Sequence, residues 1–215
     1  MYRWGEGPRI LLHHGWSGDA AQMSAFVDPL VDAGFEVIAP DALGHGDTEG
    51  RISSFVDMAT DATALVDHVG GVDAIIGHSM GAMVAARILR ARDVRRAVLL
   101  APPAEMRVYS ELFTQALEFS EAVHDAMVAH FERSHFVTWD DITAERLAEG
   151  RHEDALLVYD ADDHDAPPAH AERWIEHWPG DMTSHQTRGL GHRQILRDAS
   201  VHARVTHWLD GTQRS

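Results

Sequence analysis

The GHSMG motif at residues 77–81 carries the clearest chemical signal in the chain. A short apolar run, residues 72–76, precedes it, and an alanine-rich helical pattern follows it. This order predicts a strand, a tight turn and a helix, with Ser79 at the apex of the turn. Side chains at Gly77 or Gly81 would collide with the neighbouring strand or helix, because the backbone of such a turn is strained. The pattern predicts a nucleophilic serine, which needs a general base and a carboxylate that orients the base.

Two further motifs accompany this turn. They are His14-Gly15-Trp16 upstream and Gly189-Leu190-Gly191-His192 downstream. Together with GHSMGA, these motifs make the chain similar to the α/β-hydrolase superfamily of serine hydrolases. The resemblance extends over about residues 9–209 and is weakest in residues 102–154. In that superfamily the catalytic residues follow the order serine, acid, histidine, which implies a base late in the chain.

The resemblance implies that His192 is the catalytic base, because it lies in the glycine-flanked loop that follows the last predicted strand. The family pattern Gly-x-x-Asp-x-x-Val-Pro aligns with the aspartate-rich residues 160–167. This alignment places the acid at Asp163, with Asp162 as the runner-up. Asp160 stands where the family has glycine, and near the site its charge would favour the protonated form of His192. The alternative for Asp160 is a solvated loop charge.

Acyl transfer also requires N–H donors for the oxyanion. The resemblance implies an oxyanion hole formed by the backbone N–H groups of Met80, the residue after the nucleophile, and Trp16, in the turn after the first long strand. The Trp16 side chain would then line the acyl pocket. Chemistry of this kind needs no cofactor, and we expect none.

Two sets of histidines and aspartates could also be arranged around a metal ion. One set is His13, His14, Asp41, His45 and Asp47, and the other lies in residues 160–165. The first set lacks a His-x-His-x-Asp-His string, and the second lacks the interleaved glycine of an EF-hand loop. We therefore expect no metal.

Strands and helices that alternate along the chain must position these residues. Apolar runs predict strands at residues 9–14, 35–39, 72–76, 96–101 and 155–159, and the alternation continues with a strand near 182–187. Helical patterns lie between them, at 19–32, 54–69, after Ser79, at 168–178 and around 201–209. The alternation predicts an α/β fold, with a doubly wound, mostly parallel six-stranded sheet covered by helices on both faces.

Residues 102–154 interrupt the alternation with helical patterns alone, at 111–119, 120–134 and 140–149. A helical insertion at this point resembles the lid of an α/β-hydrolase. We therefore expect one domain over residues 1–215, with a small helical lid inserted at 102–154. This segment has few bulky apolar residues beyond six, which favours small or medium acyl groups. The six are Phe113, Leu117, Phe119, Phe131, Phe136 and Trp139.

The N-terminal part departs from the family pattern. Almost no room precedes the strand at residues 9–14 for the usual antiparallel hairpin. The strand at 35–39 would then be an uncovered apolar edge, and such edges invite partners. We expect either a homodimer that pairs or packs at this edge, or a chain whose N-terminus has been removed.

The composition restricts the function further. A chain of 215 residues with 45% hydrophobic content can form one domain with a sizeable core. The formal net charge of -16 argues against nucleic acid or an anionic membrane as a partner. No cysteine is present, which excludes disulfides and thiol catalysis. The sequence shows neither a signal peptide nor an apolar run of transmembrane length, so we expect a cytoplasmic protein.

These observations lead us to expect a carboxylesterase that acts on a small-molecule ester through Ser79, His192, Asp163 and an acyl-enzyme. Thioesterases, carbon–carbon bond hydrolases, cofactor-free haloperoxidases and acyltransferases share the fold and the triad, so they stay open. A haloalkane dehalogenase is disfavoured, because it would need aspartate in place of Ser79. The alternative from another class is a non-catalytic, hydrolase-like ligand-binding protein.

Overall fold

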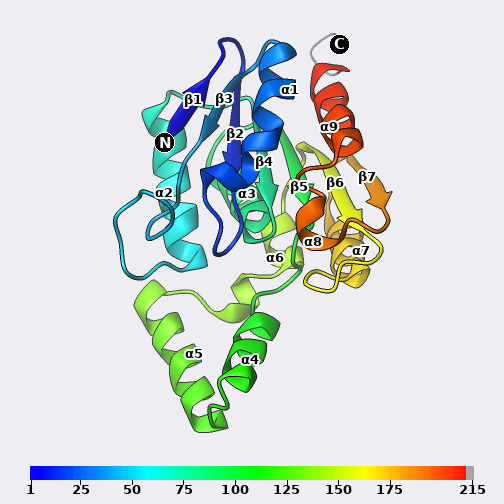
Figure 1. Cartoon of the computed structure of the whole chain (residues 1–215). Coiled ribbons are helices and arrows are strands. Elements are labelled where there is room, and N and C mark those ends of the chain that lie inside the picture. Colours follow the sequence, from blue (N-terminus) through cyan, green and yellow to red (C-terminus); the bar gives the residue numbers. More distant parts are fainter. Residues whose placement is uncertain (212–215) are drawn as a thin grey trace.

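A seven-stranded sheet forms the centre of the computed structural model, which describes residues 1–211 (Figure 1). The strands are β1 Tyr2–Trp4, β2 Arg9–His13, β3 Glu36–Ala39, β4 Ala74–His78, β5 Arg96–Leu100, β6 Asp154–Asp160 and β7 Met182–Thr187. Their order across the sheet is β1-β3-β2-β4-β5-β6-β7. Strands β2 to β7 are parallel, and β1 is antiparallel to β3. All six predicted strands are present, and the mostly parallel α/β arrangement is confirmed.

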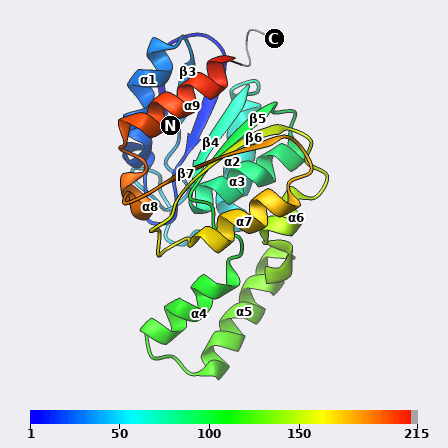
Figure 2. The same cartoon turned by 90° about the vertical axis from the view of Figure 1, so that its right-hand side faces the viewer.

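Helices cover both faces of the sheet. They are the 3-10 helix η1 Ala20–Phe26, α1 Val27–Asp32, α2 Phe55–His68, α3 Met80–Ala91, α4 Arg107–Ala116, α5 Glu121–His135, the 3-10 helix η2 Trp139–Asp141, α6 Ala144–Ala148, α7 Pro168–His177, α8 Gly191–Gln194 and α9 Ala199–Gly211. Helices α1 and α9 lie on one face, and α2, α3 and α7 lie on the other (Figure 2). The apolar core is divided by the sheet in the same way. Within residues 1–211, no helix combines the length and the apolar character needed to cross a membrane.

The central strands are buried because helices cover both of their faces. All five residues of β4 are buried, as are the last four of β2 and of β5. In parallel strands the carboxyl ends meet at one edge of the sheet, where such folds place their sites. The loops after β2, β4, β6 and β7, which carry the predicted functional residues, therefore converge at this edge.

The opposite margin of the sheet differs from our expectation. Strand β1 pairs with β3, with Trp4 opposite Val37, so the expectation of an uncovered β3 edge is wrong. The connection from β1 to β2 is short because Gly5 and Gly7 adopt positive φ angles. A Cβ atom at Gly7 would lie 2.2 Å from the carbonyl oxygen of Gly34, so only glycine fits this approach. The homodimer was expected because the β3 edge would be uncovered, and that reason no longer holds. The oligomeric state stays a prediction.

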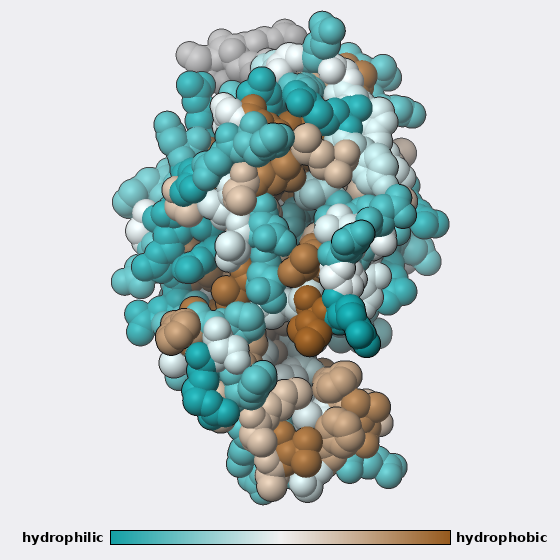
Figure 3. Space-filling view, turned by 90° about the vertical axis from the view of Figure 1, so that its left-hand side faces the viewer, coloured by the Kyte–Doolittle hydropathy of each residue, from teal (hydrophilic) through white to brown (hydrophobic). Residues whose placement is uncertain are grey.

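The segment at residues 102–154 divides into two parts. Helices α4 and α5 form a hairpin that projects beyond the carboxyl edge of the sheet, whereas α6 returns to the body and contacts α3 and α7 (Figures 1 and 2). Apolar surface gathers on the hairpin (Figure 3). The exposed large apolar residues of this part are Leu112, Phe113, Leu117, Phe119, Val123 and Phe136. Action of the hairpin as a lid stays a prediction.

Candidate active site

Ser79 lies in a strained turn between β4 and α3. Its φ of 53° and ψ of -124° fall outside the ordinary regions for a residue with a side chain. A Cβ atom at Gly77 would lie 2.1 Å from the carbonyl oxygen of Gly81, and one at Gly81 would lie 2.4 Å from the carbonyl oxygen of His13. The turn therefore needs both glycines, for the steric reason that the motif predicts.

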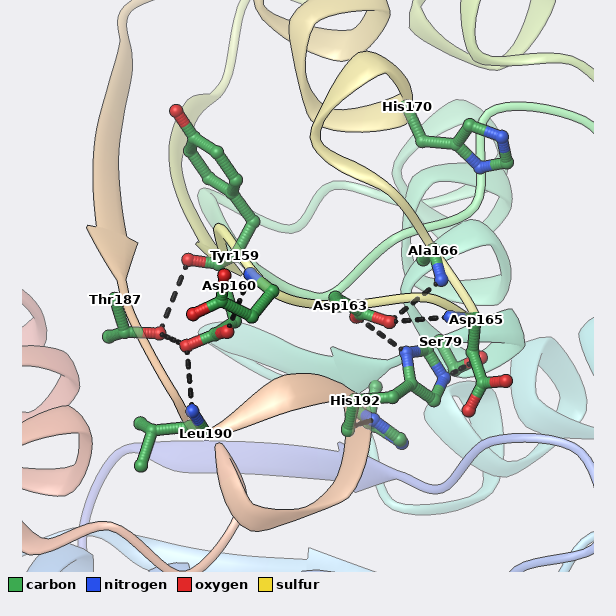
Figure 4. Close-up of polar contacts among 12 residues, drawn as sticks. Ser79, Tyr159, Asp160, Asp163, Asp165, Ala166, His170, Thr187, Leu190 and His192 are labelled. Carbon is green, nitrogen blue, oxygen red and sulfur yellow. Dashed lines mark hydrogen bonds and ion pairs between the residues drawn. The ribbon is translucent and has the colours of Figure 1, made fainter.

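The structure brings Ser79, His192 and Asp163 together in a hydrogen-bonded chain (Figure 4). The Nε2 atom of His192 lies 2.9 Å from Ser79 Oγ, and its Nδ1 atom donates to Asp163 Oδ2 over 2.8 Å. The second oxygen of Asp163 accepts from the backbone N–H groups of Asp165 and Ala166, at 2.8 and 2.9 Å. The Asp163 side chain is fully buried, and that of His192 is 13% exposed. Each polar atom of the acid is thus held by a donor.

The runner-up acid faces another way. Asp162 Oδ2 accepts from the N–H of Gly189, and Asp162 Oδ1 lies 3.6 Å from Arg188. Within residues 1–211, Asp163 is therefore the carboxylate that holds the His192 ring.

Asp160 supports the loop that carries His192. It is fully buried, so the alternative of a solvated loop charge is wrong. Its carboxylate accepts from Thr187 Oγ1 at 2.7 Å, from the N–H of Leu190 at 3.0 Å and from the N–H of Asp162 at 2.9 Å. Burial opposes its charge, but these donors outweigh burial and lower the pKa of Asp160. The carboxylate contacts the backbone around His192 rather than the imidazole ring.

His192 is held from the opposite side by His78. The expected flexible loop is in fact the short helix α8, and His78 Nε2 donates to the backbone carbonyl of His192 over 2.8 Å. The two rings lie 4.8 Å apart. Burial, together with the neighbouring His192, lowers the pKa of His78 to about 3, so this ring is neutral. The residue directly before Ser79 therefore fixes the backbone of His192.

The predicted oxyanion turn lies directly against Ser79. A Cβ atom at Gly15 would lie 3.0 Å from Ser79 Cβ, so a side chain there would be tightly crowded against Ser79. The Gly18 N–H donates to the Gly15 carbonyl over 3.1 Å, which leaves Trp16 at a central position of a β-turn with its N–H unused by the turn. Met80 is the first residue of α3 and has no intrahelical acceptor for its N–H. The Trp16 side chain is 52% exposed.

The histidines and aspartates of the first hypothetical metal set have structural partners instead. His14 Nδ1 donates to the Gly15 carbonyl, and His14 Nε2 accepts from the Ala42 N–H. Asp41 accepts from the N–H groups of Ala20 and Asp47, at 2.7 and 3.0 Å. These contacts connect the turn at residues 15–18 to the loop after β3.

Another group of metal-ligand atoms occurs within residues 1–211. One ligand atom each of Asp163, Asp165 and His192 lie within 4.8 Å of one another. A metal ion there would have to displace the proton that joins His192 to Asp163, so it would compete with the hydrogen-bonded chain described above.

Comparisons with known proteins agree with this geometry. Residues 8–147, more than half of the chain, match the family described as the alpha/beta hydrolase fold. The chain belongs to the α/β-hydrolase family. A curated relative, the non-heme haloperoxidase of Rhodococcus erythropolis, is 34% identical over 142 residues, a match that covers 62% of this chain and 51% of the relative. This α/β-hydrolase thus spans about half the length of that relative.

Solved structures extend the likeness to the whole α/β-hydrolase chain. The monoacylglycerol lipase of Paleococcus ferrophilus has a TM-score of 0.72 at 20% identity, and the alignment covers 98% of each chain. A thermophilic esterase from Thermogutta terrifontis has a TM-score of 0.69 at 22% identity, with 99% of this chain and 92% of the esterase covered. Identities this low show the shared fold alone.

Sequence reasoning missed the contact between the hairpin and the acid loop. The Tyr109 hydroxyl of α4 donates to the backbone carbonyl of Asp165 over 2.7 Å. Burial, followed by the charges of Asp163, Asp165 and Glu105, raises the pKa of Tyr109 above its usual range. A tyrosine in a helical segment gives no sequence signal for such a contact, because its acceptor lies 56 residues later in the chain.

Proposed function

We propose that this α/β-hydrolase is a serine carboxylesterase that cleaves esters with small or medium acyl groups. The observation that carries the proposal is the unbroken chain of contacts from Ser79 Oγ through His192 to Asp163, at 2.9 and 2.8 Å. These distances suit proton transfer from a serine hydroxyl to a general base. The same arrangement would serve other acyl or carbon–carbon substrates, so the assignment of esters as the substrate class has to be tested by experiment.

In the proposed reaction, Ser79 Oγ attacks the ester carbonyl while His192 Nε2 accepts the serine proton. The resulting oxyanion is stabilised by the N–H groups of Trp16 and Met80, a contribution of about 3 to 4 kcal/mol for a single such donor in comparable enzymes. His192 then protonates the leaving alcohol, and the acyl group stays on Ser79. Water activated by His192 releases the acid. Asp163 orients the imidazole throughout. No cofactor takes part, and action in the cytoplasm belongs to the same proposal.

Hydrolysis of p-nitrophenyl esters, from acetate to laurate, tests this function. The wild type should show maximal kcat/KM on short chains, and Ser79→Ala, His192→Ala and Asp163→Asn should each lower kcat by about a thousandfold or more. The Asp162→Asn variant is the matched control, because its carboxylate faces Arg188 and should be dispensable. Equal loss in the two aspartate variants would refute the assignment of the acid.

Covalent labelling separates catalysis from binding. A fluorophosphonate reacts with an activated serine, so it should label the wild type and not Ser79→Ala. A protein that labels at Ser79 yet cleaves no ester would have another acyl or carbon–carbon substrate. A protein that neither labels nor cleaves would be a ligand-binding protein.

A second candidate is a haloperoxidase activity, which the 34% identity to the Rhodococcus erythropolis haloperoxidase favours. Halogenation of an organic acceptor with bromide and hydrogen peroxide, measured for the wild type and Ser79→Ala, would detect it. Bromination that survives loss of Ser79 would separate this activity from the proposed site.

A further inference from the structure

Asp165 occupies a fixed position beside the proposed catalytic residues. Its N–H donates to Asp163 Oδ1 over 2.8 Å, and its carbonyl accepts from the Tyr109 hydroxyl over 2.7 Å. The backbone of Asp165 is therefore held on one side by the triad acid and on the other by the helical hairpin. An aspartate has only two side-chain torsions, so this anchoring confines its carboxylate to a small region.

That region borders the reacting atoms. A carboxylate oxygen of Asp165 lies within 4.8 Å of a ring nitrogen of His192. Figure 4 shows the Asp165 side chain next to the hydrogen bond between Ser79 and His192. The side chain is exposed, so its charge lies at the surface beside Ser79 and His192.

The charge of Asp165 is also uncompensated. Within residues 1–211 its carboxylate has neither a hydrogen-bond donor nor an ion-pair partner. The other acids of the loop differ in this respect. Asp160 and Asp163 each accept several hydrogen bonds, and Asp162 faces Arg188. Of the four aspartates, Asp165 is thus the one whose negative charge is left to act on a substrate.

We propose that Asp165 is a charge filter that restricts the substrates of this site to esters with neutral or cationic acyl groups. The inference rests on the proposed ester hydrolysis and names its substrate class. In the acyl-enzyme, the carbon chain of the acyl group begins at Ser79 Oγ, beside Asp165 (Figure 4), so we expect a terminal carboxylate on a four-carbon acyl group to lie near the Asp165 carboxylate. Like charges at such a distance repel, even where water partly screens them.

The filter should also act on the product. Hydrolysis leaves a carboxylate next to Ser79, and Asp165 repels it. Removal of the Asp165 charge should therefore strengthen product inhibition, an effect that loss of a merely structural contact would not produce.

Two substrates of equal acyl length test the filter. p-Nitrophenyl butyrate is neutral, whereas mono-p-nitrophenyl succinate has a carboxylate in place of the terminal methyl group. We expect the ratio of kcat/KM for succinate to that for butyrate to rise about tenfold in Asp165→Asn, which corresponds to about 1.4 kcal/mol. Butyrate should also inhibit this variant about tenfold more strongly. The rate of spontaneous ester hydrolysis is measured in the presence of Ser79→Ala and subtracted.

Asp93→Asn is the matched control. Asp93 is exposed in the loop before β5, at the edge of the sheet opposite Ser79, so its removal changes the net charge equally but not the field at the site. The substrate ratio should not change in this variant. In the wild type the ratio should rise with ionic strength, because salt screens exposed charges. This second measurement needs no variant that could fail to fold.

The outcomes separate this inference from the proposed function. One outcome overturns the filter alone. In it, the wild type cleaves p-nitrophenyl butyrate, but the succinate-to-butyrate ratio of kcat/KM is the same in wild type and Asp165→Asn and does not change with salt. Equal loss of both activities in Asp165→Asn, with the ratio again unchanged, assigns Asp165 a structural role and overturns it too. A wild type that cleaves neither ester overturns the proposed function, and the filter with it.

Discussion

Mild acid is expected to destabilise this fold through two buried histidines, His13 and His78. They are only 1% and 2% exposed, and each ring lies next to another imidazole, that of His14 or His192. Burial, followed by the charge on that neighbouring ring, lowers the pKa of each from 6.5 to about 3. The folded protein therefore keeps both rings neutral. The unfolded chain takes up a proton on each ring once the pH falls below about 6.5.

The size of the effect follows from proton linkage. Above about pH 7.5 both rings are neutral in the folded and unfolded states, so they contribute no pH dependence. As the pH falls from about 6.5 towards 3, the unfolded state is stabilised by protonation and the folded state is not. At about pH 5 each ring lowers the free energy of unfolding by about 2 kcal/mol, and the two together by about 4 kcal/mol. That is a large part of the 5 to 15 kcal/mol, roughly, that stabilises a typical domain.

Other titrating groups do not mask the effect of His13 and His78 between about pH 7.5 and 5. Burial also lowers the pKa of His14 and His170, which adds to the fall in stability in the same direction. Carboxylates with a lowered pKa act in more acidic solution. The ion pair with Arg173 lowers the pKa of Glu145 from 4.5 to about 2, so its contribution is present above about pH 4.5 and is lost as the pH falls towards 2. Between about pH 7.5 and 5 the buried histidines therefore dominate.

Urea unfolding followed by tryptophan fluorescence, at intervals from about pH 8 to 5, measures the effect. His13→Asn places an amide N–H where His13 Nδ1 donates to the His14 carbonyl, and His78→Gln places one where His78 Nε2 donates to the His192 carbonyl. Neither replacement titrates. Each should reduce the loss of stability between about pH 8 and 5 by about 2 kcal/mol, whatever its stability at pH 8. His207→Asn, at an exposed position of α9, is the control and should keep the full loss.

Two results would refute the reasoning. One is a wild type whose free energy of unfolding changes by less than about 1 kcal/mol between about pH 8 and 5, with a constant m-value. The other is a double variant, His13→Asn with His78→Gln, that retains the wild-type slope. Either result would mean that the buried rings can bind a proton in the folded state.

Three further predictions follow from contacts around the site. His78→Phe should lower kcat by about tenfold to a hundredfold with little change in KM, because the backbone of His192 loses its donor. His78→Gln should restore most of the activity, and steady-state kinetics on a neutral ester measures both variants. Asp160→Asn should lower the free energy of unfolding at neutral pH by about 2 kcal/mol, because its buried hydrogen bonds lose the charge that strengthens them. Urea titration measures this free energy, and a change below about 0.5 kcal/mol contradicts the prediction. Tyr109→Phe should lower the free energy of unfolding by about 1 kcal/mol and the Tm by about 2 to 4 °C, since the hydrogen bond to the Asp165 carbonyl is lost. An unchanged calorimetric Tm contradicts this prediction.

Much of the fold could be predicted from the sequence because its signals are local. Five of the six parallel strands, β2 to β6, are apolar runs in the buried centre of the sheet, and such runs are visible without tertiary information, whereas the edge strand β7 is polar and partly exposed. The turn at Ser79 is specified by Gly77 and Gly81, whose lack of side chains is itself the steric requirement. The strand β1 escaped prediction because three residues cannot establish a period. Its stability comes from pairing with β3, more than thirty residues away.

The contacts around His192 could not be predicted in the same way. The donor to the His192 carbonyl is His78, 114 residues earlier. Two of the donors to Asp160, the Thr187 hydroxyl at the end of β7 and the Leu190 N–H, come from nearly thirty residues later or more. A pattern in the sequence reports which residues share a face or a turn, but it does not report which side chain from another loop reaches a given backbone atom. The sequence therefore pointed to Ser79, His192 and Asp163, which the structure brings together, but not to the groups that hold them.

The aspartate-rich loop shows why composition alone is a poor guide to the chemistry of such a segment. Its four carboxylates at residues 160, 162, 163 and 165 have the same intrinsic acidity, and the backbone determines what each one does. Asp160 is buried among donors that hold the loop, Asp162 turns towards Arg188, and Asp163 reaches the imidazole. Asp165 is left with its charge facing the substrate. From composition alone, this loop would be taken for a solvated acidic cluster. A few hydrogen-bond donors instead give each aspartate a different role, and moving one donor would change these roles without changing the composition.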